Sequence, residues 1–135
     1  MQIVEWTDEY LTGSRELDAQ HKQLIYLLNK AYRNLSADSA TGDTDLILVE
    51  LMDYATFHLK YEVRWLDKAG LTDSDKHQKV LDHLRKKVLK IQNYYFRSDK
   101  ASSQKILSFM NRWITNHLAD AKASLGVNQL HAGLP

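Results

Sequence analysis

The sequence predicts an all-α protein, an antiparallel up-down four-helix bundle that follows an irregular N-terminal arm. The 135 residues include one proline, Pro135, at the very end, so that long segments carry no helix breaker. Four segments of about 20 residues repeat apolar side chains with helical spacing. The connections between them are short and polar, and helices joined by short loops pack antiparallel.

Residues 1–17 are predicted to form the arm, with Trp6 and Tyr10 as its anchors. The first helix is predicted over residues 18–37 and the second over residues 44–69, with Gly70 as a C-terminal stop. Their inward stripes recur at helical spacing. These stripes are Leu24, Ile25, Leu28 and Leu35 in the first helix, and Leu48, Leu51, Met52, Ala55, Leu59 and Leu66 in the second.

The third helix is predicted to be capped by Thr72, Asp73 or Ser74 and to end near residues 94–96. A polar turn over 97–101 leads to a fourth helix over residues 102–123. The inward stripes are Val80, Leu81, Leu84, Val88 and Ile91 in the third helix, and Ile106, Met110, Trp113, Ile114 and Leu118 in the fourth. The division expected is therefore one domain, with an arm (1–17), a bundle (18–123) and a tail (124–135).

Composition excludes several classes of function. The chain carries 18 basic and 17 acidic residues, and its formal net charge of +1 gives no reason to expect nucleic acid or a membrane as a partner. It has no cysteine, which excludes disulfides, thiolate metal sites and cysteine catalysis. No apolar run approaches the roughly 18 residues of a membrane span. The N-terminus is unlike a signal peptide, so we expect a cytoplasmic protein.

Six histidines are present, and four of them fall one per predicted helix: His21, His58, His77 and His117. Each lies at helical spacing from the apolar stripe of its own helix, which turns the imidazole inward. A lone inward histidine is usually a hydrogen-bonded core residue. Four in one bundle are harder to explain in that way, because each buried imidazole without a partner costs free energy. A shared metal would satisfy all of them, and imidazole suits iron, zinc and copper.

Glu62 strengthens the metal interpretation. It follows His58 by four residues, so both side chains share one face of the second helix. A carboxylate buried beside histidines is costly unless it is paired or bound to metal. The alternative is that Glu62 is exposed and pairs with Lys60 or Arg64.

Several runs occur together at characteristic spacings. They are Trp6 in the arm, Asp18-Ala19-Gln20-His21, Tyr54-Ala55-Thr56-Phe57-His58 with Glu62 four residues on, His77 a further 15 residues on, and Trp113-Ile114-Thr115-Asn116-His117. In this combination the chain resembles the bacterial hemerythrins over nearly its whole length. The resemblance implies a bundle that holds two non-heme irons, with an oxo or hydroxo bridge, and binds oxygen reversibly.

The resemblance also implies the ligands. His21 and His58 would hold one iron, His77 and His117 the other, and Glu62 would bridge them. Five positions match the family pattern in this way.

Two positions depart from the family pattern. Leu81 stands where the family has a further histidine, four residues after His77. His83 cannot easily replace it, because six residues along a helix rotate a side chain by ~600°, about 120° away from the direction of His77. We therefore expect His83 at the surface.

The second departure is Lys122, which stands where the family has an aspartate five residues after the last histidine. Asp120 lies three residues after His117 and shares its face, so it could supply the missing oxygen ligand or remain a surface residue. Three outcomes stay open: two irons with water filling the gaps, one metal held by His21, His58 and Glu62 with help from Asp120 or His117, or a site nearly free of metal.

We expect a binding protein rather than an enzyme, because no nucleophile or catalytic triad is evident. Its partner would be molecular oxygen or a similar diatomic molecule, carried or sensed at a site walled by Leu66, Leu81 and Trp113. Two alternatives remain: a metal enzyme for oxidation or peroxide chemistry, with an open position created by Leu81, and a signalling or interaction bundle with a degenerate site. In the last case the apolar tail would contact a partner or a second copy in a homo-oligomer.

Overall fold

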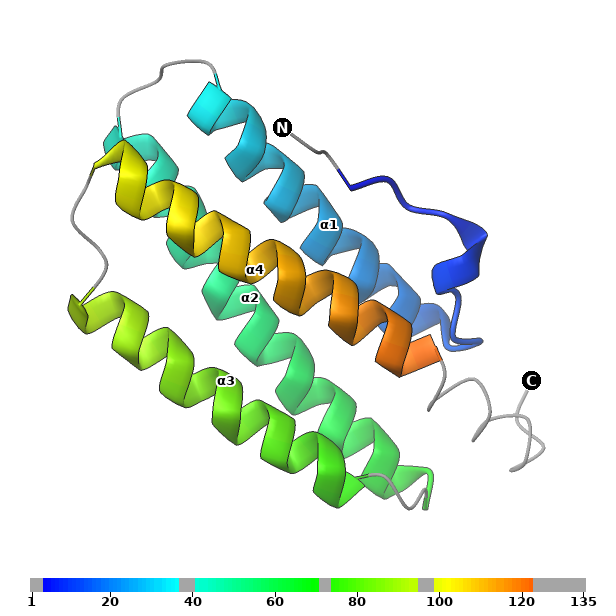
Figure 1. Ribbon diagram of the computed structural model, residues 1–135. Helices are drawn as coiled ribbons and strands as arrows, with labels where there is room; N and C mark the ends of the chain where they lie inside the picture. Colours follow the sequence, from blue (N-terminus) through cyan, green and yellow to red (C-terminus); the bar gives the residue numbers. More distant parts are fainter. Residues whose placement is uncertain (1–3, 37–40, 71–73, 95–98, 123–135) are drawn as a thin grey trace.

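The computed structural model describes residues 4–36, 41–70, 74–94 and 99–122, and within them it shows four α-helices and no strand (Figure 1). The helices are α1 (Arg15–Ser36), α2 (Thr41–Lys68), α3 (Ser74–Tyr94) and α4 (Lys100–Ala121). Successive helices run in opposite directions along the bundle (Figure 1). The predicted all-α, antiparallel four-helix bundle is confirmed. The predicted tail, including Leu125, Val127, Leu130 and Leu134, and the cap candidates Thr72 and Asp73 lie outside the described residues.

The helices bury the predicted stripes. Every stripe residue named from the sequence is buried except Val80 and Trp113, which are half-buried and pack against the core. One large apolar cluster joins all four helices. A second, small cluster of Leu17, Leu66 and Ala121 lies apart from it, with Tyr61 and Trp65 packed alongside.

The start of α1 is three residues earlier than the sequence predicted, for a physical reason. Gly13 has a φ of 94°, a conformation that turns the chain and favours glycine. Ser14 then caps the helix: its Oγ accepts from the backbone N of Leu17 at 3.3 Å. Asp18 does not cap, because its Oδ1 accepts from both the N and the Oγ1 of Thr12, at 2.9 and 2.8 Å. Asp18 thereby ties the arm to α1.

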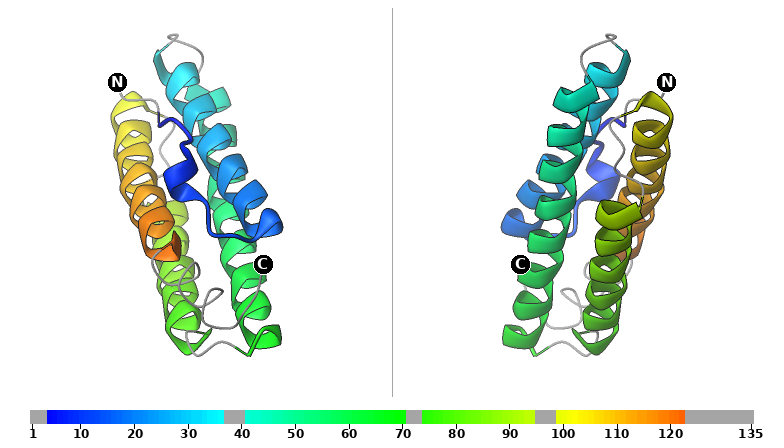
Figure 2. Two further views of the ribbon diagram at one scale, coloured as in Figure 1. Left: turned by 90° about the vertical axis from the view of Figure 1, so that its right-hand side faces the viewer. Right: turned by 90° about the vertical axis from the view of Figure 1, so that its left-hand side faces the viewer.

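The arm contains a short 3-10 helix, η1 (Asp8–Tyr10), and runs along α1 on the side of α4 (Figure 2). Trp6 and Tyr10 pack against the large cluster, which confirms them as anchors. Val4 adds a reciprocal pair of bonds to Asn29: its N donates to Oδ1 at 3.0 Å, and its carbonyl oxygen accepts from Nδ2 at 2.7 Å. The arm therefore covers the seam between α1 and α4.

The remaining helix ends follow from their caps. Gly70, with a φ of 69°, ends α2 as predicted. The start of α4 is two residues earlier than predicted, because Asp99 in the polar turn is the cap: its Oδ1 accepts from the N of Ser102 at 2.7 Å. None of the helices in the described part of the chain combines the length and apolarity that a bilayer crossing requires.

Candidate metal centre

The four inward histidines lie at the same end of the bundle because the helices alternate in direction. His21 is near the start of α1, His58 is in the second half of α2, His77 is near the start of α3, and His117 is near the end of α4. All four are buried, and His21 and His58 have no exposed surface. The centre lies between the large apolar cluster and the small one, so that apolar side chains shield it along the bundle axis.

Three imidazoles converge through the same ring nitrogen. The Nε2 of His58 lies 2.9 Å from the Nε2 of His21 and 3.1 Å from the Nε2 of His117. A neutral imidazole has one donor and one acceptor nitrogen, so three rings cannot satisfy one another through Nε2 alone. The convergence is the arrangement expected when three ring lone pairs share one positive centre.

Gln20 fixes the orientation of the central ring. Its Oε1 accepts a hydrogen bond from the Nδ1 of His58 at 2.8 Å. Because the amide oxygen can only accept, the proton of His58 is on Nδ1, and its Nε2 presents a lone pair to the centre. Outer hydrogen bonds of this kind orient metal-binding histidines. The sequence analysis quoted Gln20 within a family run without giving it a role, and its place directly before His21 was the available clue.

Glu62 brings a carboxylate to the same point. Its Oε2 lies 3.3 Å from the Nε2 of His117, and its Oε1 lies 3.8 and 3.9 Å from the Nε2 atoms of His21 and His58. The side chain is fully buried, so the inward interpretation is confirmed and pairing with Lys60 or Arg64 is excluded. Neither carboxylate oxygen has a hydrogen-bond partner in the structure.

Burial sets the electrostatics of the metal-free cluster. Desolvation raises the pKa of Glu62 to about 8. Desolvation also lowers the pKa of His21 to about 4, against a smaller upward effect of Asp18. The pKa values of His58 and His117 lie well below the ordinary value, first through desolvation and then through the neighbouring imidazoles. Without a cation, the cluster is therefore held in its neutral form near pH 7.

The donor set fits a single cation. One ligand atom from each of His21, His58, Glu62 and His117 can be chosen so that all four lie within 4.8 Å of one another. Two donors bound at about 2.1 Å to one ion lie roughly 3 Å apart when they are at right angles, which matches the distances from the Nε2 of His58 to the Nε2 atoms of His21 and His117. A cation at this point would also satisfy the two carboxylate oxygens of Glu62, which are otherwise without partners.

His77 and Asp120 lie to one side of this cluster. Together with His117 they line a cavity of about 180 Å³ between α3 and α4. His77 is buried, whereas Asp120 is exposed at the rim. Their binding to metal stays a prediction.

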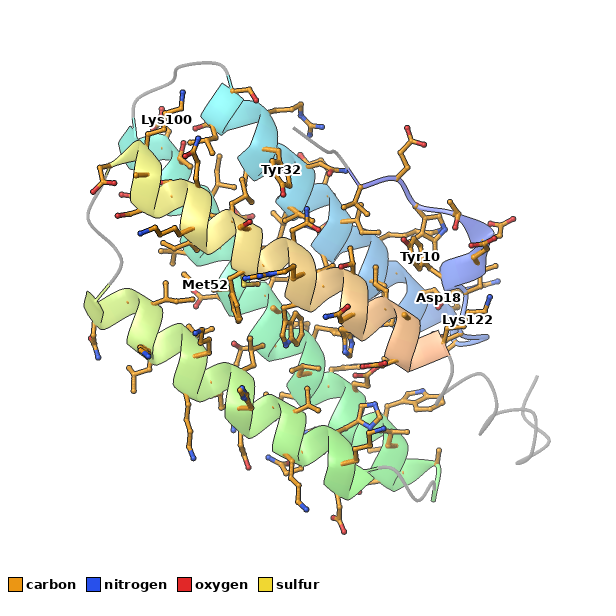
Figure 3. All side chains as sticks on the ribbon, in the orientation of Figure 1. Tyr10, Asp18, Tyr32, Met52, Lys100 and Lys122 are labelled. Carbon is orange, nitrogen blue, oxygen red and sulfur yellow. The ribbon has the colours of Figure 1, made fainter. Side chains whose placement is uncertain are left out.

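The structure also shows where Leu81, Lys122 and His83 lie. Leu81 is buried in the large cluster, so an apolar side chain fills the position where the family has a histidine. Lys122 is exposed at the end of α4 (Figure 3), so its charge can reach solvent. His83 is exposed, as predicted.

Trp113 stacks on His117 with ring centroids 5.1 Å apart and planes 5° apart, and Leu66 belongs to the small cluster.

Comparison with known proteins agrees with the geometry. No protein-family model matches the chain. A bacteriohemerythrin of Clostridium acetobutylicum is 31% identical over 120 residues, which cover 85% of this chain and 92% of that protein. A hemerythrin-like protein of Naegleria gruberi is 28% identical over 113 residues, 84% of this chain and 82% of that protein. A bacteriohemerythrin of Pseudomonas aeruginosa is 24% identical over 118 residues, 87% of this chain and 76% of that protein.

The sequence identity extends over most of the chain, and both the four-helix bundle and the buried histidine–carboxylate cluster are consistent with it. The chain belongs to the hemerythrin family.

Proposed function

We propose that His21, His58, Glu62 and His117 hold non-heme iron and that the protein binds oxygen, or a similar diatomic molecule, at this site. The observation that carries the proposal is the convergence of three Nε2 atoms on a buried carboxylate whose oxygens have no other partner. The names of its relatives, hemerythrin-like protein and bacteriohemerythrin, support iron as the metal.

The donor chemistry supports the same choice. Imidazole and carboxylate ligands with no thiolate suit iron, and the chain has no cysteine. When iron is bound, it supplies a coordination position at which a diatomic molecule can be held reversibly. The four protein donors leave room for such a position, because iron in histidine–carboxylate sites commonly accepts more than four ligands.

The surrounding residues have separate tasks. Gln20 holds the ring of His58 so that Nε2 faces the centre. The small cluster of Leu17, Leu66 and Ala121 shields the site from the end of the bundle, and Leu81 occupies a buried place on α3. These apolar neighbours limit the access of water to the donors, which favours reversible binding over side reactions.

Binding rather than catalysis is the function we propose, in the role of a carrier or a sensor. The cluster uses its imidazoles and its carboxylate as donors, and their ligand atoms converge on one point. Turnover of peroxide or of ferrous iron by the wild-type protein, above that of a His58→Ala variant, would contradict this proposal.

The test is metal analysis combined with spectroscopy. Protein reconstituted anaerobically with ferrous iron is expected to retain at least one iron per chain after gel filtration. Its absorption spectrum should change on exposure to oxygen and return under argon. His58→Ala should abolish both, whereas His83→Ala, which removes an exposed histidine, should change neither. Wild-type protein that retains less than about a tenth of an iron per chain would overturn the proposal, because tight sites are stoichiometric.

A further inference from the structure

A second cavity, of about 170 Å³, lies between α3 and α4 toward the end of the bundle opposite the metal donors. The two helices are neighbours in the bundle (Figure 1). Three apolar and three basic side chains line the cavity: Ile91, Ile106 and Phe109, and Lys87, Lys105 and Arg112. Phe109 precedes His117 by eight residues, which is about 12 Å along a helix. The lining shares no residue with the four donors, so this cavity is separate from the metal centre.

The floor of the cavity is apolar. Ile91 and Ile106 are buried in the large apolar cluster, and Phe109 is half-buried and packs against the same cluster. An engineered apolar cavity of about 150 Å³ binds benzene, so this one has room for a group of about the size of one aromatic ring. Seating such a group on these side chains removes apolar surface from water, which favours binding.

The three basic side chains of the cavity have no acid beside them to neutralise their charge. The lining contains no acidic residue, and none of Lys87, Lys105 and Arg112 forms an ion pair with another described residue. Lys87 is half-buried, whereas Lys90 on the same helix is exposed, and the Nζ of Lys87 lies 5.3 Å from the centroid of the Phe109 ring. Positive charges that line one cavity repel one another, and a bound anion relieves this repulsion.

We propose that this cavity binds a small organic phosphate, a phosphate monoester whose ester group is a single ring or a short apolar chain. The ester group packs on Phe109 and the two isoleucines, and the phosphate lies among the three basic groups. A phosphate monoester carries close to two negative charges at pH 7, so it balances three cations better than a carboxylate does. Arg112 supplies a planar guanidinium that can pair with two phosphate oxygens at once. A helix of a partner protein is about 10 Å wide, too wide to enter a cavity of this volume.

The experiment uses the metal-free full chain, dialysed to remove chelator, and phenyl phosphate as the probe. Calorimetric titration at low ionic strength should show one site per chain with a Kd on the order of 1 mM, as expected for a probe of this size. Inorganic phosphate lacks the ring and benzoate carries half the charge, so each should bind about fivefold more weakly or worse. In the NMR spectrum, the backbone amide signals of Ile91, Ile106 and Phe109 should shift with the same Kd.

Charge variants test the side of the cavity that receives the phosphate. Lys105→Gln and Arg112→Gln should each weaken the binding of phenyl phosphate about fivefold at low ionic strength, and the effect should fade at high salt. Lys87→Met keeps an apolar stem against Phe109, so it should weaken binding by a similar factor without lowering the melting temperature. The matched control is Lys79→Gln, which removes an exposed charge of α3 outside the cavity and should change the affinity less than about twofold.

A further variant tests the apolar floor. Phe109→Leu removes the ring on which the phenyl group stacks, so it should weaken phenyl phosphate about threefold and leave the binding of inorganic phosphate unchanged. Leu89→Ala, at an exposed position of α3 outside this cavity, is the control and should change neither.

Four results would overturn the proposal. The first is the lack of saturable binding of phenyl phosphate up to about 10 mM. The second is equal affinity for inorganic phosphate, the behaviour of a basic surface that receives an acidic segment of a partner protein. The third is equal affinity for benzoate, which would rule out the phosphate. The fourth is an equal loss in Lys79→Gln and Lys105→Gln, which would place the anion outside the cavity. Each of these results leaves the proposed function intact, because the titration is made without metal.

Discussion

In the metal-free protein, Glu62 and the three clustered imidazoles change the stability of the native state in opposite directions as the pH changes. Burial raises the pKa of Glu62 from 4.5 to about 8. Between these two pH values Glu62 keeps its proton in the native protein but loses it in the unfolded chain. Stability from this residue therefore falls as pH rises toward 8. The pKa of His21 is lowered from 6.5 to about 4, and those of His58 and His117 are lowered as well. The three histidines therefore lower the stability of the native protein as pH falls below 6.5, because they gain protons more readily in the unfolded chain.

We predict that the chelated protein is most stable near pH 6.5. Between pH 6.5 and 8.5 its free energy of unfolding should fall by ~0.7 kcal/mol, because the loss from Glu62 exceeds the gain that arises as the three histidines lose their protons in the unfolded chain. Glu62→Gln should remove this fall. Urea unfolding at the two pH values in EDTA measures both proteins, and a wild-type protein that is equally stable at both pH values would refute the prediction.

Gln20 allows a second prediction on the residue scale. Gln20→Leu removes the acceptor from the Nδ1 of His58, so the ring loses its fixed orientation and tautomer. Metal affinity should fall about 10–100-fold, as measured by competition with a chromophoric chelator. Gln23→Leu, on the same helix and half-buried, is the control and should retain wild-type affinity. Equal affinities in the two variants would contradict the orienting role.

The sequence was sufficient to predict which residues face inward but not which of them meet. Helical spacing turned His21, His58, His77 and His117 toward the core, because the period of a helix is a local property. Whether His77 joins the other three depends on how far α3 stands from α4, which is set by packing across the bundle. Gln20 was overlooked for the same reason: its partner, His58, is 38 residues away.

At the scale of the helices, the apolar repeat located all four, and the errors fell at their ends. α1 begins at Arg15 rather than near Asp18, because Gly13 turns the chain and Ser14 caps the helix. α4 begins at Lys100, because Asp99 caps it from within the expected turn. Caps depend on which polar side chain is otherwise engaged, and such tertiary competition is not visible in a local pattern.

The cap of α4 gives a prediction on this scale. Asp99→Ala removes the bond from the N of Ser102 and should lower the free energy of unfolding by about 1 kcal/mol. The melting temperature should fall by about 4 °C, with no change in metal content, because the cap lies at the opposite end of α4 from His117. Asp99→Asn keeps the acceptor and is the control. Calorimetry measures both, and a loss of metal in Asp99→Ala would contradict the independence of the two ends.

For the whole molecule, the cluster should couple metal to stability. A ligand at 100 times its Kd stabilises the native state by about 2.7 kcal/mol, which corresponds to a melting temperature about 11 °C higher for a domain of this size. Chelation of the loaded protein should therefore lower its melting temperature by about that amount. His58→Ala should show no such response to EDTA. A wild-type protein with the same melting temperature before and after chelation would favour the interaction-bundle alternative.

The large apolar cluster spans all four helices without including any metal donor. A newly synthesised chain can therefore reach its native shape before it meets an ion, in contrast to small zinc domains that stay unfolded until they are metallated. The site would then take up its ion after folding. Replacing one metal by another in the purified protein should need only dialysis, with no denaturation and renaturation.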